Sequence, residues 1–159
     1  MAQDSLRPRD AGRSRRCRPV AGRALTLVVD ASIAVPACLS KAGFSVLPED
    51  DLAAPGLLWS ETLSVLHELV WRREITTVDG DAARQALEDA PVRRVDDPGL
   101  ADEAWRMAET LGWAKTYDAE YVALARLLGC RMVTLDARLR RGADRLGLVV
   151  TLDELDASR

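Results

Sequence analysis

Four acidic residues lie at the ends of the chain's best-defined apolar segments: Asp30, Glu61, Asp118 and Asp136. Asp30 and Asp136 each follow an apolar run that predicts a buried strand, and the other two fall where helices are expected to begin. If the two strands are parallel neighbours, their carboxyl ends meet at one edge of a sheet, so the acids converge there. Converging carboxylates repel one another unless a cation lies among them, so the sequence predicts a divalent-metal site.

The predicted metal is Mg²⁺ or Mn²⁺, because both prefer oxygen ligands and leave positions open for water or a substrate phosphate. We expect Asp30 to bind the metal directly. Asp118 and Asp136 would complete the site, partly through bound water, and Glu61 would bind the metal or orient the attacking water. This set of side chains predicts hydrolysis of a phosphodiester by a metal-activated water. The sequence contains neither a Walker lysine loop nor a GxGxxG motif.

Three polar residues near the acids have two interpretations each. Ser32 either caps the helix that follows Asp30 or holds a metal-bound water through its hydroxyl. Thr134 is either an ordinary β-branched strand residue or a support for a metal ligand. Arg138 is either a solvated helix charge or a contact to a substrate phosphate. The sequence leaves these alternatives open.

Predicted strands and helices alternate along the chain from Leu25 onward. The strands are expected at residues 25–30, 56–59, 92–95, 132–135 and 148–151. The helices are expected at residues 31–39, 61–73, 79–90, 98–112, 117–128 and 137–146. Ser60 is the expected N-cap of the helix 61–73, and residues 41–54 have the composition of a loop. The apolar stripe of that helix is predicted to consist of Leu63, Leu66, Leu69 and Val70.

This alternation predicts βαβ units with right-handed crossovers. The expected fold class is α/β, a three-layer α/β/α sandwich with a five-stranded parallel sheet. Ligands of such sheets bind beyond the carboxyl ends of the strands, close to the place where the strand order reverses. Asp30 and Asp136 are expected at that place.

Composition divides the chain into a basic start and an acidic body. Residues 1–24 carry seven Arg and two Asp, whereas residues 25–159 carry 15 Lys or Arg and 23 Asp or Glu. The hydrophobic fraction of 48% supports one domain with a substantial core. An acidic body is not typical of a general nucleic-acid binder, although metal ions that neutralise the acids locally would allow action on nucleic acid.

We expect residues 1–23 to be a basic, disordered tail or the product of a misassigned start codon, and residues 24–159 to form the domain. A basic arm that touches RNA is the functional alternative. An export signal is not expected, because the apolar run 24–29 is shorter than the roughly 7–15 residues of a signal core. No segment approaches the roughly 20 apolar residues of a membrane span. Three cysteines without metal-site spacing indicate a reduced, cytoplasmic protein.

Four segments, in order, resemble the motifs of PIN-domain ribonucleases, and in particular the VapC toxins of bacterial type II toxin–antitoxin pairs. The first is Val29-Asp30-Ala31-Ser32, and the second is Trp59-Ser60-Glu61 with Leu66. The third is Tyr117-Asp118-Ala119-Glu120-Tyr121-Val122-Ala123-Leu124-Ala125, which is the most distinctive, and the fourth is Thr134-Leu135-Asp136-Ala137-Arg138-Leu139. The resemblance covers roughly residues 25–152.

The resemblance implies an endoribonuclease that depends on Mg²⁺ or Mn²⁺ and cleaves structured RNA such as transfer or ribosomal RNA. It also implies a homodimer that is silenced by a VapB-type antitoxin, whose peptide inserts near the active site. All four acids match the motifs of the family. Two departures concern the arginine-rich residues 1–23 and the loop-like segment 41–54, which occupies the place of a helical hairpin.

Other functions remain as alternatives. A PIN nuclease of RNA processing outside a toxin pair, or a PIN module that only binds partners, would share the same motifs. A haloacid-dehalogenase-type phosphatase requires Asp-x-Asp after its first strand, and here the third position is Ser32. A receiver-like signalling domain requires a Lys beside its fifth strand, and the segment 148–151 has none.

Overall fold

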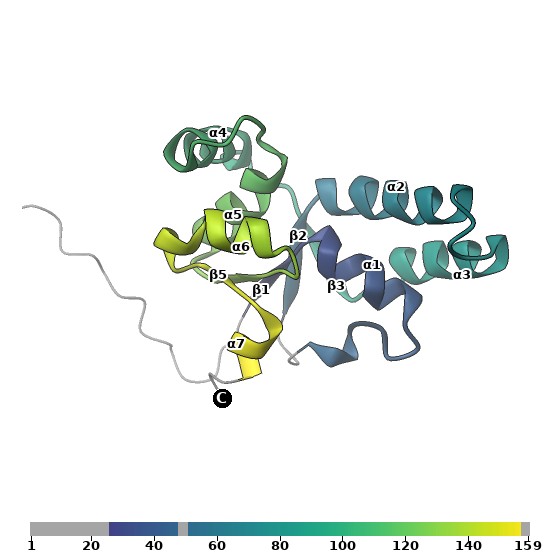
Figure 1. The fold of residues 1–159 in the computed structure, drawn as a ribbon. Coiled ribbons are helices and arrows are strands. Elements are labelled where there is room, and N and C mark those ends of the chain that lie inside the picture. Colours follow the sequence, from purple (N-terminus) through teal and green to yellow (C-terminus); the bar gives the residue numbers. More distant parts are fainter. Residues whose placement is uncertain (1–25, 48–50, 157–159) are drawn as a thin grey trace, which may run out of the picture.

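The computed structural model describes residues 26–47 and 51–156. Its five strands form one sheet in the order β3-β2-β1-β4-β5, and every pair of neighbours is parallel (Figure 1). The strands are β1 (Leu27–Val29), β2 (Leu52–Pro55), β3 (Val92–Val95), β4 (Arg131–Val133) and β5 (Val149–Val150). The predicted five-stranded parallel sheet is therefore confirmed.

Helices cover both faces of the sheet. The longer ones are α1 (Ala31–Leu39), α2 (Leu57–Trp71), α3 (Thr77–Glu88), α4 (Leu100–Leu111) and α5 (Tyr117–Leu128). The short ones are α6 (Ala137–Gly142), α7 (Leu152–Asp156) and the 3₁₀ turns η1 (Gly43–Val46) and η2 (Asp144–Leu146). Figure 1 shows α1, α2 and α3 on one side of the strands and α4, α5 and α6 on the other, as right-handed crossovers require.

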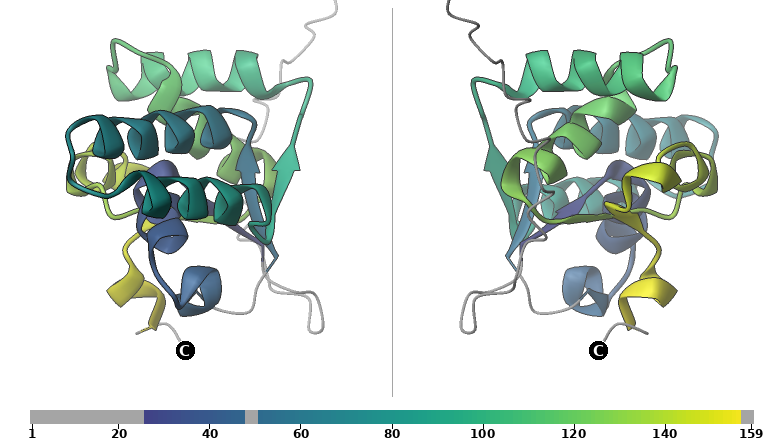
Figure 2. Two further views of the ribbon diagram at one scale, coloured as in Figure 1. Left: turned by 90° about the vertical axis from the view of Figure 1, so that its right-hand side faces the viewer. Right: turned by 90° about the vertical axis from the view of Figure 1, so that its left-hand side faces the viewer.

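The two helical layers differ in how they meet the sheet. Helices α1, α2 and α3 pack on one another, and Figure 2 shows α2 and α3 side by side as a helical hairpin. Helix α5 lies against β1, β2 and β4, and α4 covers its outer side. Because α5 is enclosed by the sheet and α4, its residues 121–125 are all buried. The small alanines of this helix allow that close packing on both sides.

The segment between α1 and α2 differs from the prediction. The expected loop 41–54 contains η1 and most of β2, and the expected strand 56–59 is the start of α2. Ser60 is not an N-cap: its hydroxyl donates a hydrogen bond to the carbonyl of Leu57, 2.9 Å away, inside the first turn of the helix. A short apolar run fits a buried strand and a buried helix equally well, and this run lies in a helix because Pro55 ends the strand before it.

The buried stripe of α2 is also shifted from its expected position. Leu58, Thr62 and Leu66, spaced four residues apart, are fully buried or nearly so, whereas Leu63 is 45% exposed. Leu66 of the predicted stripe is therefore confirmed as buried, whereas Leu63 does not belong to the buried face. Among the described residues, no helix is long and apolar enough to cross a membrane. The predicted tail, residues 1–23, lies outside the described residues.

Candidate active site

The strand order places the predicted acids at one edge of the sheet. The chain runs outward from β1 to β3, then returns to β4 on the other side of β1, so the order reverses between β1 and β4. Val29 and Val133 are paired neighbours, and they are the last residues of these strands. Asp30 and Thr134 follow directly, so both lie at the carboxyl edge where parallel sheets bind their ligands.

Asp30 is buried, with 5% of its surface exposed. One carboxylate oxygen, Oδ1, accepts hydrogen bonds from Ser32 Oγ at 2.6 Å and from the backbone N–H of Ile33 at 3.2 Å. The other, Oδ2, accepts from Thr134 Oγ1 at 2.6 Å. Burial raises the pKa of Asp30, and the nearby charge of Asp136 raises it further, against these hydrogen bonds. Asp30 is thus the N-cap of α1, and it is also a buried carboxylate whose negative charge a nearby cation would stabilise.

Ser32 and Thr134 join the ends of β1 and β4. Their hydroxyl oxygens lie 3.2 Å apart. Ser32 Oγ accepts from the backbone N–H of Leu135 at 2.8 Å, and Thr134 Oγ1 accepts from that of Asp136 at 2.9 Å. Both hydroxyls therefore support the acids, and Thr134 does so while fully buried.

Asp136 caps α6 at the same edge. Its Oδ1 accepts from the backbone N–H groups of Arg138 at 2.7 Å and Leu139 at 3.1 Å. Asp118 opens α5 with an exposed side chain, and its pKa is raised by partial desolvation and by the charge of Asp136, while the cations Arg138 and Lys115 lower it. Asp136 therefore acts electrostatically on both Asp30 and Asp118, which places the three Asp residues in one neighbourhood.

Glu61 reaches this neighbourhood through Tyr121. The phenolic O–H of Tyr121, on α5, donates to Glu61 Oε2, on α2, at 2.5 Å. Burial raises the pKa of the Tyr121 hydroxyl, and the bond to Glu61 and the charges of Glu61, Asp30 and Glu120 raise it further. The bond crosses the carboxyl edge of the sheet, because α2 and α5 lie on opposite faces.

The donor set fits Mg²⁺ or Mn²⁺ in chemical kind, because every side chain offers hard carboxylate oxygens. Among residues 26–47 and 51–156, no three acidic, His or Cys side chains stand together in a ready-made metal cage. Three of the four carboxylates accept hydrogen bonds within the protein: Asp30 from two hydroxyls, Glu61 from Tyr121 and Asp136 from the start of α6.

Comparison with known proteins decides the family. A model of the PIN domain matches residues 27–145. Ribonuclease VapC9 of Mycobacterium tuberculosis is 37% identical over 114 residues, which cover 71% of this chain and 87% of that protein. VapC ribonuclease Mb0985 of Mycobacterium bovis matches with the same identity and coverage. The chain belongs to the PIN-domain family, among the VapC ribonucleases.

Solved structures agree with this VapC-type fold. PAE2754 from Pyrobaculum aerophilum superimposes with a TM-score of 0.63 at 25% identity, and the match covers 82% of this chain and 92% of that one. A toxin–antitoxin complex from Klebsiella pneumoniae gives a TM-score of 0.57 at 16% identity, covering 79% and 97%. The second likeness is evidence for the fold alone.

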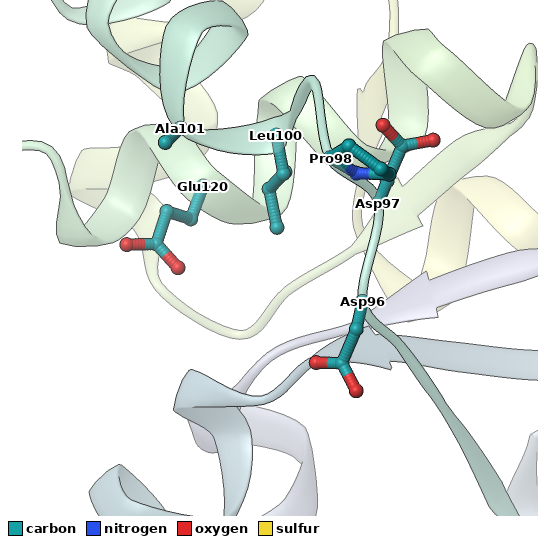
Figure 3. A pocket seen from close by; sticks show the side chains of 6 residues that line it. All are labelled: Asp96, Asp97, Pro98, Leu100, Ala101 and Glu120. Atoms are coloured by element: carbon teal, nitrogen blue, oxygen red, sulfur yellow. The ribbon is translucent and has the colours of Figure 1, made fainter.

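A hollow of about 390 Å³ opens at the same edge of the VapC-type sheet (Figure 3). Its acidic side chains are Asp96 and Asp97, which follow β3, and Glu120 on α5. Burial raises the pKa of Glu120. The four predicted acids are not among the residues that line this hollow, so the hollow is not the candidate site itself.

Sequence reasoning missed the role of Tyr121. The sequence shows Tyr121 only as part of the third motif, and in the structure it lies in the core, with 1% of its surface exposed. The available signal was a phenolic hydroxyl in the middle of an alanine-rich buried helix, because a buried Tyr O–H usually finds an acceptor. The partner, Glu61, could not be identified without the packing of α2 and α5.

Proposed function

We propose that this protein is a divalent-metal-dependent endoribonuclease and the toxin of a toxin–antitoxin pair. The observation that carries the proposal is the buried carboxylate of Asp30 at the end of the central strand. The negative charge of Asp136 is close enough to raise the pKa of that carboxyl. Membership of the VapC ribonucleases supports RNA as the substrate class. A buried carboxylate with other acids near it needs a cation before the site can accept a phosphodiester.

In this proposal Asp30, Glu61, Asp118 and Asp136 hold Mg²⁺ or Mn²⁺. When bound, the metal lowers the pKa of a water molecule and stabilises charge on the phosphoryl oxygens. The chain's own groups orient the ligands: two hydroxyls hold Asp30, and Tyr121 holds Glu61. The cationic side chains Lys115 and Arg138, whose charges reach Asp118, would contact the substrate phosphate.

The proposed partners follow from the family. A VapB-type antitoxin would cover the site, in line with the fold shared with the toxin–antitoxin complex from Klebsiella pneumoniae. We also propose a homodimer, action on transfer or ribosomal RNA, and a cytoplasmic location. Expression without the antitoxin should arrest bacterial growth, and co-expression of the adjacent antitoxin gene should restore it. Growth that is unaffected by the active protein would favour RNA processing outside a toxin pair.

The direct test is cleavage of RNA by the purified protein. Cleavage should require Mg²⁺ or Mn²⁺, stop in EDTA, and be lost in Asp30→Asn, whose amide keeps the shape of the carboxylate but not its charge. Asp81→Asn, an exposed position on α3, is the matched control and should cleave at the wild-type rate. Equal cleavage in EDTA, or an active Asp30→Asn variant, would refute the proposal.

A further inference from the structure

Arg94, on β3, has an unusual position. The Cζ atom of its guanidinium lies 5.9 Å from the ring centroid of Trp59, within the range of a cation–π contact. The same guanidinium lies against the backbone of Gly56: a Cβ placed on Gly56 would be 2.6 Å from Arg94 Nη2 and 2.9 Å from Cζ. The absence of a side chain at Gly56 therefore lets Arg94 reach the start of α2.

The guanidinium of Arg94 lies beside the N-terminus of α2, where the helix dipole disfavours a cation. Gly56 is the N-cap of α2 and offers no side-chain acceptor, so the first backbone N–H groups of this helix present positive partial charge. The side chain of Arg94 is 57% exposed, and its carboxylate partner, Asp96, is more exposed still, with Nε and Oδ1 3.4 Å apart. Such an exposed ion pair is weak and exchanges readily for another anion. An anion at the helix start would satisfy both the guanidinium and the free N–H groups.

This cation lies on the active-site edge of the sheet. Val28 pairs with Ala53, and the next residue, Ala54, pairs with Arg94, so Arg94 is level with the end of β1. Strand β3 is two positions from β1 in the sheet, which corresponds to roughly 10 Å. A nucleic-acid strand that reaches the acids can therefore place a neighbouring phosphate beside Arg94.

We propose that Arg94, held over Gly56 and stacked on Trp59, binds a backbone phosphate of the RNA substrate at the N-terminus of α2. The inference rests on the proposed ribonuclease function and deepens it. RNA approaching an acidic body needs a fixed cation, and the planar guanidinium suits the bidentate recognition of phosphate. The Trp59 ring, packed against the core, holds the guanidinium in place before the RNA arrives.

The test measures binding of a short fluorescent single-stranded RNA by anisotropy, in Mg²⁺, on an Asp30→Asn background that does not cleave it. Arg94→Gln should weaken binding about tenfold and reduce the slope of log K against log salt by roughly 0.7, the value of one phosphate contact. Gly56→Ala keeps every charge, and its backbone conformation suits alanine, but its Cβ displaces the guanidinium. It should weaken binding to a similar extent.

Two controls separate this site from general effects of charge and backbone. Arg84→Gln removes the same charge from an exposed ion pair on α3, and Gly99→Ala changes the N-cap glycine of α4. Both should leave the salt slope unchanged and affinity within about twofold, because neither removes a phosphate contact. Circular dichroism and thermal melts confirm that each variant is folded.

Unchanged affinity and slope in Arg94→Gln, or an equal loss in Arg84→Gln, would overturn the inference. A titration with inorganic phosphate distinguishes a free anion from RNA. Phosphate binding that depends on Arg94, with RNA affinity unaffected, would also overturn it. Cleavage by the wild-type protein is measured separately, so a protein that cleaves RNA but ignores Arg94 refutes this inference and leaves the proposed function standing.

Discussion

Tyr121 connects helices α5 and α2 through one hydrogen bond, which its hydroxyl donates to Glu61. Its ring is buried in the core, and the hydrogen bond to the carboxylate of Glu61 is 2.5 Å long. Held this way, Glu61 loses less freedom when it meets a metal ion or a water molecule, because its orientation is already set. The same residue therefore serves packing through its ring and the site through its oxygen.

Tyr121→Phe separates these two roles. The ring remains, so the free energy of unfolding should fall by about 1.5–3 kcal/mol, the typical value of a hydrogen bond to a charged group. The rate of RNA cleavage should fall at least about tenfold, and the Mg²⁺ concentration for half-maximal activity should rise, because Glu61 is released. Tyr117→Phe removes a hydroxyl from an exposed tyrosine on the same helix and should change neither. Wild-type metal dependence in Tyr121→Phe would show that the bond serves packing alone.

The thiols of Cys38 and Cys130 provide a test of pH dependence. Burial raises the pKa of each to about 11, so both are protonated at neutral pH. Because the thiolate is the reactive form, alkylation of the native protein by iodoacetamide should be slow at pH 8 and accelerate as the pH approaches 11. Mass spectrometry of a Cys17→Ser variant would follow both sites. Rapid labelling at pH 8 in the folded protein, equal to that in urea, would contradict this expectation.

At the scale of elements, the sequence predicted α1, β3 and α5 with their observed bounds, because each has strong periodicity and clear stop signals. It failed at β2. That strand is Leu52-Ala53-Ala54-Pro55, without a β-branched or aromatic residue, so its own propensity does not favour a strand. It forms because β1 and β3 supply hydrogen-bonding partners on both sides, which is a tertiary effect.

The end of α5 illustrates an element whose limit the sequence does determine. Gly129 has φ +64°, a left-handed conformation that suits glycine, and a Cβ there would contact nothing within 4 Å. Gly129→Ala should therefore cost about 1 kcal/mol through backbone strain alone. The midpoint of thermal unfolding should fall by roughly 2–4 °C, measured by circular dichroism. Gly129→Asn should lose less, since Asn tolerates this conformation better, and an unchanged midpoint in both variants would contradict the argument.

At the scale of the whole molecule, the convergence of Asp30 and Asp136 could be predicted because it follows from parallel strands on either side of a reversal in strand order. The family prediction is confirmed by the PIN match and the VapC relatives. The bond between Glu61 and Tyr121 could not be predicted, because it depends on how two helices on opposite faces extend past the sheet. The limits of the domain, residues 24–159, and the metal roles of the acids stay predictions.

The acids also imply that the metal-free protein is less stable than the metal-bound protein, because their negative charges are not neutralised. A ligand that binds only the folded state adds about 2.7 kcal/mol at a hundred times its dissociation constant. Saturating Mg²⁺ should therefore raise the midpoint of thermal unfolding by roughly 5–10 °C, relative to NaCl of equal ionic strength. Asp30→Asn should lose this response. In EDTA the same variant should be at least as stable as the wild type, because it removes a buried charge that faces Asp136. If Asp30→Asn still gains stability from Mg²⁺, the metal does not bind at Asp30. If the variant is much less stable than the wild type in EDTA, the main role of Asp30 is to cap α1.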